Sequence, residues 1–163
     1  MAILSKVNAM YATLIFFHSV FRWLVLISLI YSIFRAWRGY TTNRQFTKTD
    51  HAIRQWTVNF VHLQFVIGFT LYLSSPLIKS FYSDFNVAIR HLDMAFFGIA
   101  HILCMFVAVA LISVGSGMAK RKPSDKEKFK AMLLWFSIAL LIIFIAIPWP
   151  FSPFANRPYL RPF

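Results

Sequence analysis

The sequence has a single cysteine, Cys104, and only five acidic residues among its 163. One cysteine cannot form an intrachain disulfide, and the chain has no C-x-x-C-H motif for covalent attachment of haem. The shortage of carboxylates disfavours a tetrahedral zinc or copper site. No serine, cysteine or acid lies at a spacing that would pair with a base for hydrolysis. These absences argue against a disulfide scaffold, a covalent haem site and a hydrolase.

Apolar residues, in contrast, are abundant: 59% of the chain is hydrophobic and 18% is aromatic. A helix that crosses the hydrocarbon of a membrane needs about 20 mostly apolar residues, because unpaired peptide groups are costly in lipid. Four segments meet this requirement, at residues 10–34, 56–74, 92–116 and 131–149. The sequence therefore predicts an all-α, integral membrane four-helix bundle with up-down topology, in which residues 1–163 form a single transmembrane domain.

Basic residues give the chain a net charge of +12 and are unevenly distributed. They are concentrated in the connection between the first and second spans and in the connection between the third and fourth. Cytoplasmic connections of membrane proteins are enriched in Lys and Arg, so these two connections are expected in the cytoplasm and both termini on the outer, periplasmic side of a bacterial inner membrane. Attraction to anionic membrane lipid accounts for the basic excess, and no nucleic-acid partner is expected. The eleven residues that mark the predicted cytoplasmic side are Arg35, Arg38, Arg44, Lys48, Arg54, Lys120, Arg121, Lys122, Lys126, Lys128 and Lys130.

Prolines and a capping motif mark where the predicted helices end. Pro76 is expected to end the second span and Pro123 the third, and Ser124 with Glu127 resembles a capping box for the fourth. The final stretch, IPWPFSPFANRPYLRPF, contains five prolines and cannot continue a helix. We expect it to lie along the outer surface, either as an aromatic interface anchor or as a strap that docks a partner.

Three histidines, His18, His62 and His101, lie within predicted spans, where an ionisable group usually marks a functional site. We estimate the depth of each histidine from its distance in residues to the outer end of its span, multiplied by the helical rise of about 1.5 Å per residue. His18 and His101 then lie roughly 12 to 14 Å below the outer boundary of the membrane, and His62 about 18 Å below it. The first and third spans of an up-down bundle are parallel and diagonal. Two level imidazoles on these spans can take the two axial positions of a b haem, which makes His18 and His101 the predicted iron ligands. The alternative for each histidine is a hydrogen bond to a neighbouring helix.

Other residues of the spans extend this interpretation. Gly98 shares a face with His101 and leaves room either for a porphyrin or for close helix packing. Arg22 follows His18 by four residues, so it can pair with a haem propionate or lie against helix carbonyls. Gln55 and Asn59 share a face with His62, and this polar line can bind a second cofactor or a quinone, or hold helices together.

Four stretches of the sequence resemble a small bacterial four-helix integral membrane family labelled cytochrome b-like. The resemblance covers most of the chain and implies that the histidines of the family correspond to His18, His62 and His101. An acidic residue commonly precedes the third histidine in that family, whereas this chain has Ala100, which argues against proton transfer there. The stretches are HSVFRW, HLQFVIGFTLYLSSP, AHILCMFVAVALISVGSG and IPWPF.

The expected function is that of an inner-membrane b-type cytochrome-like subunit with bis-histidine haem b. It would pass electrons between a quinol and a partner, as part of a larger membrane complex rather than as a stand-alone enzyme. The alternative from another class is a non-catalytic accessory or assembly subunit with structural histidines. A third is a protein that handles porphyrin or copper. In each case, membrane lipid and other membrane protein subunits are the expected partners.

Overall fold

A computed structural model describes residues 2–161, with side chains from residue 9 onward. Within these residues the chain is helical apart from its turns and C-terminal segment, and the described part contains no strand. Four helical rods are long and apolar enough to cross a membrane. The prediction of an all-helical chain with four candidate membrane spans is therefore confirmed.

The rods differ in length and regularity. The first two are α1 and α2, and the third is formed by α5, η1 and α6 in continuous succession over Leu92–Arg121. Two short helices, α3 and α4, connect the second rod to the third. The elements are α1 Ala2–Thr41, α2 Lys48–Ser74, α3 Pro76–Ser83, α4 Phe85–Ala88, α5 Leu92–Ala95, η1 Phe96–Ala100, α6 His101–Arg121 and α7 Asp125–Ala146.

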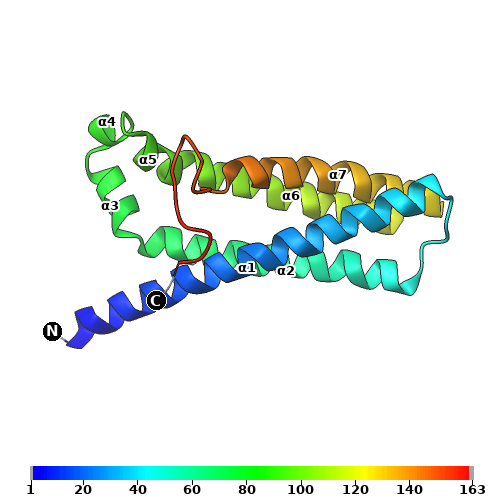
Figure 1. The fold of residues 1–163 in the computed structure, drawn as a ribbon, viewed down its shortest axis with the longest axis horizontal. Helices are drawn as coiled ribbons and strands as arrows, with labels where there is room; N and C mark the ends of the chain where they lie inside the picture. The colour runs from blue at the N-terminus through cyan, green and yellow to red at the C-terminus, as the bar shows by residue number, and fades with distance from the viewer. Residues whose placement is uncertain (1, 162–163) are drawn as a thin grey trace.

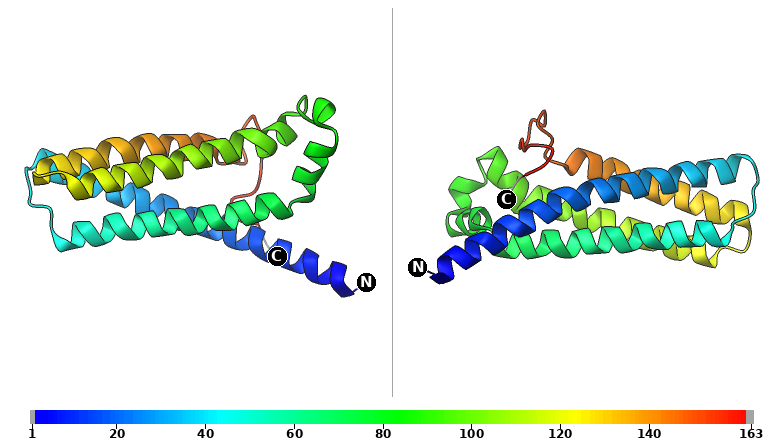
Figure 2. Two further views of the ribbon diagram at one scale, coloured as in Figure 1. Left: turned by 180° about the vertical axis from the view of Figure 1, so that it is seen from behind. Right: turned by 60° about the horizontal axis from the view of Figure 1, so that its bottom comes forward.

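Consecutive long helices run in opposite directions (Figures 1 and 2). Helix α1 packs against α2 and α7, and α6 packs against the same two helices. As a result α1 and α6 are diagonal across the bundle and parallel to each other. The turns at 42–47 and 122–124 lie at one end of the bundle, whereas α3 to α5 and both ends of the chain lie at the other (Figure 1).

Apolar side chains both fill the interior and cover the exterior of the bundle. Leu29, Ile112, Phe129 and Phe136 are fully buried. Large apolar side chains on the outer faces of all four rods are exposed, including Ile27, Leu73, Leu103 and Leu141. A contiguous apolar exterior of this extent is unfavourable in water and suits contact with lipid.

The helices differ from the predicted spans mainly at their ends. Helix α7 ends at Ala146 rather than Trp149, because the residue before a proline avoids helical backbone and Ile147 is extended at φ −72° and ψ 130°. Helix α2 ends at Ser74, before Pro76, as expected. Ser124 caps α7 by accepting the Glu127 N–H at 3.3 Å, which is one half of the predicted capping box; the Glu127 carboxylate accepts the Ser124 hydroxyl at 2.9 Å instead of the Ser124 backbone N–H.

A capping box that the sequence reasoning missed begins α2 eight residues before the predicted span. The Asp50 carboxylate accepts the Thr47 backbone N–H at 2.9 Å and the Thr47 hydroxyl at 2.7 Å. It also forms ion pairs with Arg35 at 2.8 Å and Arg44 at 3.0 Å. The Asp50 side chain is only 1% exposed. This carboxylate therefore joins α1, the 42–47 turn and α2 at one end of the bundle.

Replacing Asp50 with Asn should lower the free energy of unfolding by about 3 kcal/mol, because it leaves two guanidinium groups without their counter-ion. The measurement is thermal unfolding of the purified chain in detergent, followed by circular dichroism. Asp125→Asn is the matched control: its carboxylate pairs with Lys128 at 2.7 Å but is 37% exposed, so the expected loss of stability is much smaller than for Asp50→Asn. Equal losses in the two variants would contradict the assignment of Asp50 as the junction.

Candidate functional site

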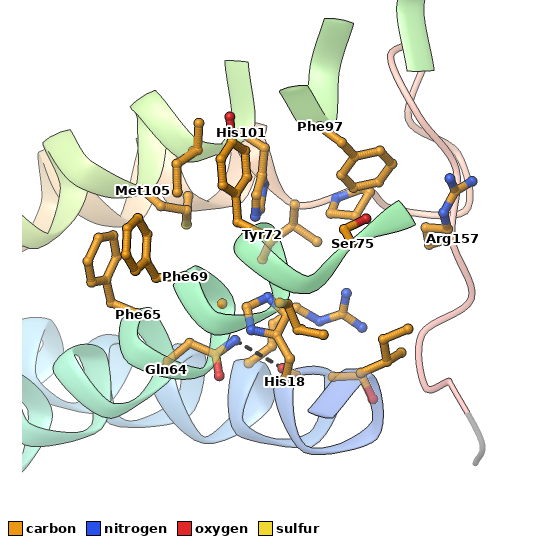
Figure 3. A pocket seen from close by; sticks show the side chains of 18 of the residues that line it. His18, Gln64, Phe65, Phe69, Tyr72, Ser75, Phe97, His101, Met105 and Arg157 are labelled. Atoms are coloured by element: carbon orange, nitrogen blue, oxygen red, sulfur yellow. Dashed lines mark hydrogen bonds between the residues drawn. The ribbon is translucent and has the colours of Figure 1, made fainter. Parts of the chain in front are cut away.

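A cavity of about 230 Å³ lies between α1, α2 and α6, towards the end of the bundle that carries α3. Helix α1 contributes His18 and Arg22, and α6 contributes His101. Figure 3 shows the two imidazoles extending into the cavity from opposite sides. The sequence reasoning placed these two histidines level on diagonal helices, and the structure brings them to one cavity. Further lining residues are Gln64, Phe65, Gly68, Phe69, Tyr72, Ser75, Met105, Arg157 and Arg161.

The His101 ring is held in a defined orientation by a backbone carbonyl. Its Nδ1 lies 2.8 Å from the Ala146 carbonyl oxygen at the end of α7. A carbonyl can only accept, so Nδ1 carries the hydrogen, and in the neutral imidazole Nε2 then carries the lone pair. No hydrogen bond from the described residues reaches Nε2. This is the arrangement of metal-binding histidines, whose second nitrogen donates to a carbonyl or carboxylate.

The IPWPF stretch explains why that carbonyl is free. In a continuing helix, the carbonyls of Phe144 and Ala146 would accept from residues 148 and 150, but both are prolines and have no N–H. The Trp149 indole donates to the Phe144 carbonyl at 2.8 Å, and His101 takes the Ala146 carbonyl. The two prolines thus create the acceptor that orients the histidine.

A turn of π-helix, η1, directly precedes His101. The His101 backbone N–H donates to the Phe96 carbonyl, which is the wider spacing of a π-helix. Such turns insert one extra residue into a helix, and they occur frequently at functional sites. Here the turn sets the rotation of α6 at the position where its imidazole enters the cavity.

His18 is positioned by α2, through residues that the sequence reasoning missed. The Gln64 side-chain amide donates to the His18 carbonyl at 2.9 Å. The imidazole lies directly over Gly68, where an added Cβ would be 2.8 Å from its Cε1 atom. His18 Nδ1 and Gln64 Oε1 are buried and have no hydrogen-bond partner among the described residues. Buried polar atoms rarely lack partners, so these two mark the cavity as a place for a polar or metal-containing ligand.

Two of the predicted cofactor-binding residues lie elsewhere. His62 is on an exposed face of α2, and its Nε2 is 2.9 Å from the Ser113 hydroxyl of α6. Gly98 does not line the cavity, because the Phe81 ring packs on it, 2.7 Å from where a Cβ would be. Of the two uses foreseen for small residues on this face, Gly98 serves close packing. The predicted polar line also fails to enter the core: Gln55 and Asn59 are exposed and bond to each other at 3.1 Å.

The C-terminal segment, residues 148–161, folds back over the cavity, and we call it the strap (Figure 1). The Tyr159 carbonyl accepts hydrogen bonds from the Arg22 guanidinium and, at 3.2 Å, from the Trp23 indole. Arg157 forms an ion pair with Asp93 at 3.1 Å and lies over the Phe97 ring at 4.9 Å. The sequence reasoning expected an interface anchor or a partner-docking strap, whereas these contacts are with the chain itself.

The donor set of the cavity suits an iron porphyrin. No group of three or more His, Cys, Asp or Glu among the described residues gathers closely enough to hold a metal ion. Two imidazoles suffice for a haem, because the macrocycle supplies the other four donors. The cavity is smaller than the roughly 300 Å³ or more of most small-molecule sites. Side chains such as Phe65 and Met105 would therefore have to move outward for the cavity to admit a haem.

Comparisons with known proteins found no matching family model, curated protein or solved structure. What the cavity can bind therefore follows from its own residues. Gln64 and Gly68 carried a signal in the sequence that could have been used: with Tyr72 they recur at a spacing of four and form one face of α2. The docking of Arg157 and Arg161 had no such local signal, because it depends on contacts between the two ends of the chain.

Gly68→Ala should displace the His18 imidazole, since a methyl group at this position overlaps its Cε1 atom. Overpacking costs about 1–3 kcal/mol and alanine gains up to about 1 kcal/mol in a helix, so a net loss of up to about 2 kcal/mol is expected. The measurement is the NMR signal of the His18 Cε1–H, with thermal unfolding in parallel.

Gly117→Ala is the matched control, because its Cβ would meet only the Arg121 guanidinium, at 3.8 Å. This variant should leave the His18 signal in place and raise stability slightly. An unchanged His18 signal in Gly68→Ala would show that the imidazole does not rest on α2.

Proposed function

We propose that this chain is a b-type cytochrome-like membrane subunit that holds haem b between His18 and His101. The observation that carries the proposal is the convergence of these two imidazoles on one cavity from diagonal helices. When bound at this position, haem would supply one-electron redox chemistry. The resemblance of the sequence to a cytochrome b-like family points in the same direction.

The residues of the chain would have distinct roles toward this group. The Ala146 carbonyl holds the hydrogen of His101 on Nδ1 and leaves Nε2 for iron. Gly68 and Gln64 fix where His18 stands on α1. The aromatic and thioether side chains of Phe65, Phe69 and Met105 exclude water from the cavity. Together they provide an apolar environment with two nitrogen donors, which suits an electron carrier more than a catalyst of hydrolysis.

Membrane orientation is part of the proposal. The concentration of basic residues near the 42–47 and 122–124 turns supports a cytoplasmic location for these turns in a bacterial inner membrane. Both termini and the cavity then lie towards the periplasmic side of an up-down bundle. A quinol in the membrane would be the electron donor, and another membrane protein subunit the acceptor, since the chain has little mass outside its helices.

A second candidate is an accessory or assembly subunit whose histidines join helices. The hydrogen bond between His62 and Ser113 supports it, because it links α2 to α6 away from the cavity. The bond between His101 and Ala146 likewise links α6 to α7. The two candidates differ in one property: only the first requires a ligand between His18 and His101.

His18→Ala and His101→Ala should each abolish the low-spin absorption spectrum of bis-histidine haem, because either change removes one axial ligand. The measurement is an oxidised-minus-reduced spectrum of the purified chain after haem supply. His62→Ala, the matched control, should keep the full spectrum. A wild-type chain without a Soret band would refute the haem site. Histidine variants that are stable and active and that co-purify with a larger complex would favour the accessory role.

The orientation can be tested with an impermeant thiol reagent applied to intact cells in a Cys104→Ala background. A cysteine in place of Lys79, an exposed residue of α3, should be labelled from outside. A cysteine at Lys122, in the turn between α6 and α7, should be labelled only after the membrane is opened. The reverse pattern would place both termini in the cytoplasm.

A further inference from the structure

Three arginines line the part of the cavity that faces the strap. Arg22 comes from α1, one turn after His18, whereas Arg157 and Arg161 come from the strap itself. The Arg161 backbone N–H donates to the Ser19 hydroxyl at 3.4 Å, which attaches this end of the strap to α1. Positive charge from both ends of the sequence is thus concentrated beside the two imidazoles.

Only one of these arginines has a carboxylate partner within the described residues. Arg157 is neutralised by Asp93. Neither Arg22 nor Arg161 takes part in any salt bridge formed by the described part of the chain. Arg22 donates to the Tyr159 carbonyl, but its Nε is buried without a partner. At the strap side the cavity therefore has two guanidinium groups for which the described residues provide no carboxylate partner, those of half-buried Arg22 and exposed Arg161.

An unpaired cation beside an apolar cavity is costly unless an anion accompanies it. The Trp23 and Trp149 rings, 5.6 Å and 5.9 Å from the Arg22 guanidinium carbon, offset part of this cost. Neutral rings and carbonyls nevertheless leave the formal charge in place. A planar guanidinium matches the geometry of a carboxylate, to which it can donate two parallel hydrogen bonds.

We infer that Arg22 and Arg161 bind the carboxylate substituents of the ligand held between His18 and His101. This inference rests on the proposed function and narrows its ligand class, because it requires an acidic rather than a neutral or esterified porphyrin. It also makes the strap part of the binding site, since Arg161 belongs to it. The two imidazoles select the metal, and the two arginines select the acidic edge of the macrocycle.

The test compares hemin with hemin dimethyl ester, in which both propionates are neutral. The full chain, purified in a neutral detergent, is titrated with each compound, and dissociation constants are obtained from the absorption change. The wild type should bind hemin at least about tenfold more tightly than the ester, which is the scale of charge-assisted hydrogen bonds. Arg22→Gln and Arg161→Gln should each weaken hemin binding by a similar factor and leave ester binding unchanged.

Arg90→Gln is the matched control, because Arg90 is an exposed arginine at the same end of the bundle and does not line the cavity. It should retain the wild-type preference for hemin. Arg22→Lys should retain part of it, since the charge is kept and the planar fork is lost.

Each result decides a different point. Equal wild-type affinity for the two compounds, with bis-histidine spectra for both, would overturn the inference and leave the proposed function standing. Absence of that spectrum with either compound would refute the proposed function and the inference with it. Ester binding also reports folding of each variant. If Arg22→Gln no longer binds the ester, that variant is misfolded and the test rests on Arg161, which is exposed. An unchanged preference for hemin over the ester in Arg161→Gln would then overturn the role assigned to Arg161.

Discussion

Backbone hydrogen bonding in the absence of water is the constraint on which this structure depends. A chain whose exterior is apolar must satisfy its peptide groups internally, and four long helices do so. Free carbonyls then occur only where a helix is interrupted. Several polar side chains at the cavity end of the bundle bond to carbonyls at such interruptions or in the non-helical strap. His101 and Trp149 use carbonyls freed by the two prolines after α7, Tyr72 donates to Gly98 within η1, and Arg22 donates to Tyr159 in the strap.

The two ends of the bundle satisfy their charges differently. At the 42–47 turn, one buried carboxylate, Asp50, forms ion pairs with two guanidinium groups, those of Arg35 and Arg44. At the cavity end, Arg157 has Asp93, whereas Arg22 and Arg161 have carbonyl, hydroxyl and aromatic neighbours. The first end is therefore a structural junction held together by ion pairs within the chain. The second end leaves Arg22 and Arg161 without a carboxylate partner among the described residues.

Much of the fold could be predicted from the sequence, because the length of an apolar run sets how far a helix extends. The sequence also predicted that His18 and His101 lie level on parallel helices, and both residues line one cavity; their role as ligands stays a prediction. The rotation of each helix about its own axis could not be predicted. Core-facing and lipid-facing side chains are both apolar in a membrane protein, so His62 gave no sign that it lies outside the cavity. Gly98 was ambiguous for the same reason, and the π-turn before His101 depends on packing that no local pattern reveals.

The strap has a consequence for the order of events during synthesis. His18 leaves the ribosome long before Tyr159 does, yet the strap covers the cavity by contacting Arg22, one turn after His18. The helices can insert and pair before that contact exists. The cavity is thus uncovered on the strap side until residues 148–161 have been synthesised. The contact between the strap and Arg22 therefore forms after the first helix has been made, and the cavity can be reached from that side before it forms.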